Sequence, residues 1–135
     1  MRIRAHLRVV AVVSLLASTC GCGTDASTVL RSLGSWAATG AMVAEAWAAG
    51  ATPRAYAART LERAQRQLAE QTRELGTVPA RQRTLATPIT ERVQKGLREL
   101  TDAVRAGNRA AARTLASSLA EDARRLQALG RREAS

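Results

Sequence analysis

The stretch STVLRSLGSWAATGAMVAEAWAAG, residues 27–50, decides the fold because it carries two adjacent apolar rows at helical spacing. Alternating steps of four and three residues are the heptad pattern of a helix that packs against other helices. We therefore expect a largely buried helix over about residues 27–49, with an all-small second row that lets a neighbouring helix come close. The first row is Val29, Leu33, Trp36, Gly40, Val43 and Trp47, and the second is Gly34, Ala37, Ala41, Ala44 and Ala48.

Proline, glycine and asparagine mark the boundaries between this helix and three others. Thr52-Pro53 and Thr87-Pro88 each predict a capping threonine with proline at the first helical position. Gly107-Asn108 predicts a helix end followed at once by an N-cap asparagine. The three further helices are expected at about residues 53–75, 87–106 and 109–129.

The fold class follows from composition and connection lengths. The 135 residues include no Phe, one Tyr and two Trp, while alanine and leucine dominate, which favours helices packed on small side chains. Each helix has one apolar face that it cannot bury alone. We predict an all-α fold, an antiparallel four-helix bundle of two helical hairpins over 28–130, with a frayed polar tail at 131–135. The alternative is a pair of hairpins that opens or swaps to form a homodimer.

The N-terminal segment has the anatomy of a secretory signal peptide. Arg2, Arg4 and Arg8 precede an apolar run over 9–17, which is shorter than the about 20 residues needed to span a bilayer. We expect residues 1–21 to be removed, which lowers the formal net charge from +10 to +7. The protein is then exported rather than cytoplasmic.

The run that follows, Ser18-Thr19-Cys20-Gly21-Cys22, resembles the lipobox of bacterial lipoproteins. Small or apolar residues lead there to Gly, Ala or Ser and then to the lipidated cysteine, so Cys22 fits the pattern better than Cys20. The resemblance implies that Cys22 is acylated, with chains such as palmitate, and becomes the N-terminus of the mature protein, with 22–27 as a tether. Two acyl chains give a stable membrane anchor.

The same resemblance bears on the membrane that holds the protein. Gly23, not Asp, follows the lipidated position, so the retention signal of many inner-membrane lipoproteins is absent. In a Gram-negative host this implies the periplasmic face of the outer membrane. The alternatives for the two cysteines are secretion without lipid, a strained Cys-x-Cys disulfide, and a metal site that lacks further ligands.

The predicted mature chain contains few of the residue types that take part in catalysis or bind metals. The only histidine, His6, lies in the signal peptide, which excludes most zinc and haem sites and histidine-dependent nucleophiles in the mature chain. We expect no metal, no cofactor and no enzymatic activity. Glu45 and Asp122 are the candidate buried carboxylates. The alternative is that Glu45 points outward and that Ala123 takes the core position beside Asp122.

Two functions remain. The first is a non-enzymatic, lipid-anchored cell-envelope protein that contacts an envelope protein or an anionic polymer, such as a cell-wall polymer or lipopolysaccharide. Export argues against nucleic acid, and the alternative for the arginines is that they only solvate the outer helix faces. The second is a carrier that holds a small apolar ligand between the hairpins, against Trp36 and Trp47, unless these are core or membrane-interface residues. The candidate polymer contacts are Arg54, Arg59, Arg63 and Arg66.

Overall fold

The computed structural model describes residues 25–135, which form four α-helices and no strand within that range. The predicted signal peptide, Cys20 and Cys22 lie outside the described residues. No helix in the described part of the chain is both long and apolar enough to cross a bilayer. The helices are α1 (Ala26–Ala48), α2 (Arg54–Arg73), α3 (Ala80–Arg105) and α4 (Arg109–Ala134), with a 3-10 turn, η1 (Glu74–Thr77), between α2 and α3.

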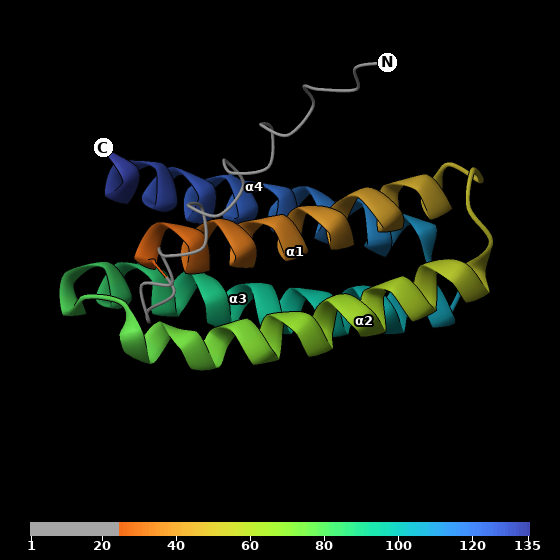
Figure 1. The fold of residues 1–135 in the computed structure, drawn as a ribbon. Coiled ribbons are helices and arrows are strands. Elements are labelled where there is room, and N and C mark those ends of the chain that lie inside the picture. The colour runs from red at the N-terminus through yellow and green to blue at the C-terminus, as the bar shows by residue number, and fades with distance from the viewer. Residues whose placement is uncertain (1–24) are drawn as a thin grey trace, which may run out of the picture.

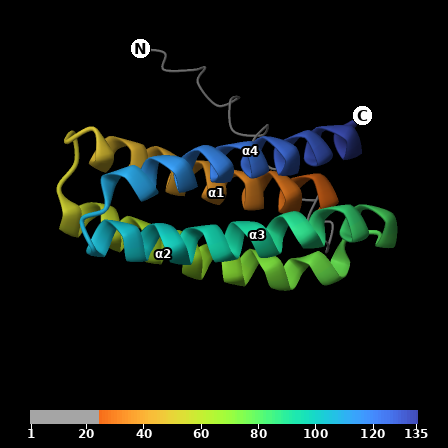
Figure 2. The same cartoon turned by 180° about the vertical axis from the view of Figure 1, so that it is seen from behind.

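The helices form a bundle of two layers, with α1 beside α4 and α2 beside α3 (Figures 1 and 2). The α1–α4 pair is the most extensive contact, and α1 and α3 also touch across the diagonal. At one end of the α1–α4 pair, Arg113 donates a hydrogen bond to the Ala48 carbonyl, and at the other end Gly130 lies against Ser27. The sequence-based prediction of an all-helical bundle is therefore confirmed.

The small residues of α1 produce the close α1–α4 approach. A Cβ atom built on Gly34 would stand 2.7 Å from Cγ of Gln127 and 3.0 Å from the Ala123 carbonyl oxygen. A Cβ atom on Gly130 of α4 would stand 3.1 Å from the Ser27 carbonyl oxygen. The two distances to carbonyl oxygens, 3.0 and 3.1 Å, are shorter than ordinary carbon–oxygen contacts. The backbones of α1 and α4 are therefore in direct contact at these two points. The small second row predicted for this helix is buried along its full length.

The first apolar row of α1 is less central than its spacing predicts. Leu33, Gly40 and Trp47 are buried, but Trp36 and Val43 are only half-buried. The buried face is rotated toward the small row because α1 packs mainly on α4. Helices α2, α3 and α4 each contribute a narrower apolar stripe of leucine, valine and alanine that closes the core from the other sides.

Two turns agree with the sequence. Gly50 and Gly107 follow the ends of α1 and α3 with φ of +80° and +71°, a region that glycine enters without steric cost. The side chain of Asn108 then accepts a hydrogen bond of 3.0 Å from the Ala111 amide, so it caps α4 as expected.

The start of α3 differs from the expectation. The helix begins at Ala80, and Pro88 lies inside it, where no N–H is present to donate to the Thr84 carbonyl. Thr87 is not a cap, since its hydroxyl donates to the Arg83 carbonyl one turn back. The additional turns are held by tertiary contacts, because Ala86 is buried and Gln82 donates to Glu133 of α4. Tertiary packing therefore overrides the local signal of the proline.

Two further boundaries are corrected. Pro53 occupies the position before the first residue of α2, where Thr52 was expected, and no side chain caps this helix. At the other end of the chain, α4 continues to Ala134, so most of the segment 131–135 is helical rather than a frayed tail.

Candidate functional site

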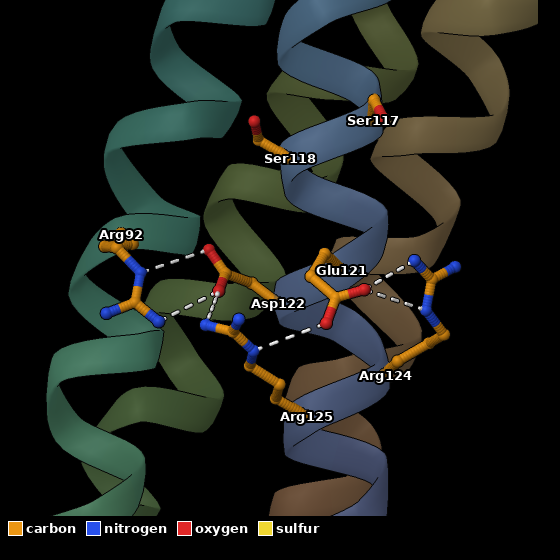
Figure 3. A pocket seen from close by; sticks show the side chains of 7 residues that line it. All are labelled: Arg92, Ser117, Ser118, Glu121, Asp122, Arg124 and Arg125. Carbon is orange, nitrogen blue, oxygen red and sulfur yellow. Dashed lines mark hydrogen bonds and ion pairs between the residues drawn. The ribbon is translucent and has the colours of Figure 1, made fainter.

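Charged side chains line an open groove of about 530 Å³ on the surface of α4, where it borders α3 (Figure 3). Three arginines alternate with two carboxylates along it, and two serine hydroxyls lie farther along α4. The groove therefore combines hydrogen-bond donors with one excess positive charge. Its lining consists of Arg92, Ser117, Ser118, Glu121, Asp122, Arg124 and Arg125.

The centre of this cluster is the bidentate pair of Arg92 on α3 and Asp122 on α4. Arg92 donates from Nη2 to Oδ1 of Asp122 at 2.9 Å and from Nε to Oδ2 at 3.3 Å. The carboxylate is mostly buried, whereas half of the Arg92 side chain is exposed. The hydrogen bond to Asp122 raises the pKa of Arg92 further above its already high ordinary value. The pair links the two helices and satisfies a charge that would be costly to bury alone.

The exposed part of the cluster is built around Glu121. Arg124 donates to Oε2 of Glu121 from Nη2 at 2.6 Å and from Nε at 3.2 Å. Arg125 stands between the two carboxylates, 3.5 Å from Glu121 and 3.7 Å from Asp122. The hydrogen bond from Arg124, followed by the charges of the arginines, lowers the pKa of Glu121 below its ordinary value of 4.5.

This arrangement suits binding better than proton transfer. A general acid or base works best with a pKa near the operating pH, and the pKa of Glu121 moves away from neutrality. Both carboxylates already accept from arginines, so their role is to hold guanidinium groups in position. The remaining N–H donors and the two serine hydroxyls would suit an acidic group of a partner.

The structure resolves the alternatives for the two candidate carboxylates. Glu45 is exposed on α1, as the outward-pointing alternative proposed. Asp122 and Ala123 are both buried, so alanine does not replace the carboxylate at the helix interface. The partner of Asp122, Arg92, was not identified from the sequence. The sequence does hold one indication of this role for Arg92. It follows the apolar residue Ile89 by one helical turn, which places it at the edge of the apolar face of α3.

Three of the four candidate polymer contacts share one surface. Arg59, Arg63 and Arg66, which we call the α2 basic face, follow the spacing i, i+4, i+7 and are exposed on the side of α2 opposite its buried residues. Within residues 25–135 none of the three forms an ion pair. Arg54 lies apart from them, with its guanidinium against Gly107 at the α3–α4 turn.

One acidic residue that borders this face on α2 is engaged elsewhere. Glu62 forms an ion pair with Arg105 of α3. The i,i+4 pair of Glu62 with Arg66 that the helical spacing suggests is therefore replaced by a bond between helices. Nε of Arg59 donates a hydrogen bond of 3.3 Å to the Ala55 carbonyl, and in the described part of the chain the other donors of the α2 basic face have no hydrogen-bond partner.

The two tryptophans have different environments. Trp47 is 4% exposed and lies under the Arg109 guanidinium, whose central carbon is 5.8 Å from the ring centroid. Trp36 is half-buried and packs on the edge of the core. The groove of Figure 3 is lined by neither of them. A ligand pocket at these residues stays a prediction.

Within residues 25–135 no group of three or more potential metal-binding side chains comes together. The predicted lipidation site, Cys22, lies outside the described residues. Comparison with family models, curated proteins and solved structures finds no match to this chain.

Proposed function

We propose that the protein is a non-enzymatic, lipid-anchored component of the bacterial cell envelope that binds an anionic polymer through the α2 basic face. In this proposal residues 1–21 are a signal peptide, acylated Cys22 anchors the chain, and the helices run antiparallel as two hairpins. The contacts of Ala48 with Arg113 and of Ser27 with Gly130 support that helix orientation.

One observation carries the proposal: Arg59, Arg63 and Arg66 are exposed on one helix face and form no ion pair within residues 25–135. Some other arginines of the bundle pair with carboxylates between helices, as Arg92 does with Asp122 and Arg105 with Glu62. A row of unpaired guanidinium groups is complementary to a chain of phosphates or carboxylates, because each group can donate two parallel hydrogen bonds.

The geometry of the row also favours an extended partner. Residues 59 and 66 are seven positions apart, so their backbones are about 10 Å apart along the axis. A flexible acidic polymer can contact the three side chains in turn without entering a pocket. Binding of this kind depends on charge and weakens as salt screens it.

The experiment compares two triple variants with equal loss of charge. Arg59, Arg63 and Arg66 are replaced by glutamine in the first, and the exposed residues Arg81 and Arg83 of α3 and Arg131 of α4 in the second. Binding of the purified protein to lipopolysaccharide and to wall teichoic acid is measured as separate probes over a range of salt concentrations. We expect the first variant to lose about tenfold or more in affinity and the second about twofold or less.

The salt dependence separates the proposed partner from a protein partner. Affinity that falls steeply with salt and depends on the α2 basic face supports the polymer. Equal loss in both variants would reduce the effect to net charge and contradict a dedicated face. If neither probe binds, the polymer is not the partner, and in vivo crosslinking from residues on α2 would then test for a protein.

A further inference from the structure

A second, apolar groove of about 270 Å³ lies between α3 and α4 and shares Arg125 with the charged groove. Leu85 and Ile89 line it from α3, and Ala128 and Leu129 line it from α4. Arg125 and Arg132 complete the lining. Apolar walls between two cations distinguish this groove from the charged one, which contains two carboxylates.

Two contacts join α3 to α4 on either side of Leu85 and Ile89 in the sequence. They are the hydrogen bond of Gln82 with Glu133 and the ion pair of Arg92 with Asp122. Ten residues of α3 separate these contacts, a distance of about 15 Å along the helix axis. Leu85 remains 52% exposed at the rim, and it is one of three large apolar side chains in residues 25–135 with a mostly exposed surface. The groove therefore places a half-exposed leucine beside two arginines.

The two arginines are available for an anion. Arg125 and Arg132 are seven residues apart and lie on the same face of α4, at either side of the apolar walls. Arg132 forms no ion pair in the described part of the chain. Arg125 is 55% exposed, and its contacts with Glu121 and Asp122 are long, at 3.5 and 3.7 Å. A negative head group with an apolar chain matches this pattern of charge.

We propose that the α3–α4 groove binds one acyl chain of an anionic phospholipid, with the phosphate of the head group on Arg125 and Arg132. Its position is consistent with a membrane ligand, because Gly130 of α4 lies against Ser27, which follows Cys22 by five residues in the sequence. In this last respect the inference rests on the proposed lipid anchor. The acyl chain would cover Leu85, Ile89 and Leu129.

The test maps where a lipid touches the protein. The purified full-length chain is exposed to lysophosphatidylglycerol with a photoreactive diazirine in its acyl chain, and to a neutral monoacylglycerol with the same chain. Trypsin then separates residues 84–92 and 126–131, which hold Leu85, Ile89 and Leu129, from residues 9–17 of the signal peptide. Mass spectrometry therefore scores crosslinks in the groove separately from attachment through the signal peptide.

We expect the anionic probe to label 84–92, and Leu85→Gln to reduce that labelling. Replacing Arg125 and Arg132 by glutamine should lower it about tenfold, while replacing their neighbours Arg124 and Arg131 should leave it within about twofold. Labelling that avoids 84–92, or that is the same for both probes and both variants, would overturn the inference. The result is independent of the anchor, since acylation of Cys22 is read from the intact mass and not from this peptide.

Discussion

The carbonyl oxygen of Ala123 on α4 lies 3.0 Å from the point where a side chain on Gly34 of α1 would begin. This contact sets the spacing of the α1–α4 pair, because neither backbone can move away without opening the buried small row. The bundle consequently depends on glycine at a helical position where alanine would otherwise be preferred.

Gly34→Ala should destabilise the protein by roughly 1–3 kcal/mol, since the added methyl group meets backbone that cannot rotate away. Gly96→Ala is the matched control, because its Cβ would stand at an ordinary 3.6 Å from Cδ1 of Leu119. The free energy of unfolding of that variant should rise by up to about 1 kcal/mol, because alanine has a higher helix propensity than glycine. Urea denaturation of both variants measures the difference. Equal changes in the free energy of unfolding of the two variants would show that the close approach at Gly34 does not limit the packing of α1 on α4.

The ion pair between α3 and α4 is the second test of packing. Asp122→Ala should lower the free energy of unfolding by about 1–3 kcal/mol, because the bidentate bond to Arg92 is lost at a mostly buried position. Glu99→Gln at the exposed pair with Lys95, whose N–O distance is 3.7 Å, should change it by less than about 0.5 kcal/mol. A double-mutant cycle with Arg92→Ala gives the coupling energy. A coupling energy near zero would mean that the lost stability comes from repacking around Asp122 and not from its bond to Arg92.

Stability should also depend on pH through Glu121. Its pKa is lower in the folded than in the unfolded state, so its contribution is present above the unfolded pKa of about 4.5 and is lost as the pH falls through the folded value. Glu121→Gln should therefore be less stable than the wild type at pH 7, and the gap should narrow at about pH 2.5. Denaturation at both pH values measures this gap. A gap that stays constant with pH would contradict the role of the carboxylate charge.

Local features of the chain were predictable from the sequence, whereas contacts between helices were not. Gly107-Asn108 specifies its own turn and cap, and the structure has both. Pro88 was misread as a helix start because packing of Ala86 and the bond from Gln82 extend α3 upstream. Asp122 meets an arginine 30 residues away, and helical periodicity does not reveal which helices are neighbours. The three-membered α2 basic face was predictable because residues on one helix share a face at i, i+4 and i+7.

The tryptophans give a test of the carrier hypothesis. Trp47 is enclosed beneath Arg109, so in Trp36→Phe its emission should resist quenching by acrylamide more than that of Trp36 in Trp47→Phe. A core role predicts that neither emission changes when an apolar dye is added. A dye-induced shift in the Trp47 signal would instead favour a ligand between the hairpins.

The intact mass of the protein isolated from the membranes of the cells that express it tests the proposed lipid anchor. We predict a chain that begins at Cys22 and carries the mass of at least two acyl groups. A soluble cytosolic chain that retains residues 1–21, or a secreted chain without lipid, would contradict it.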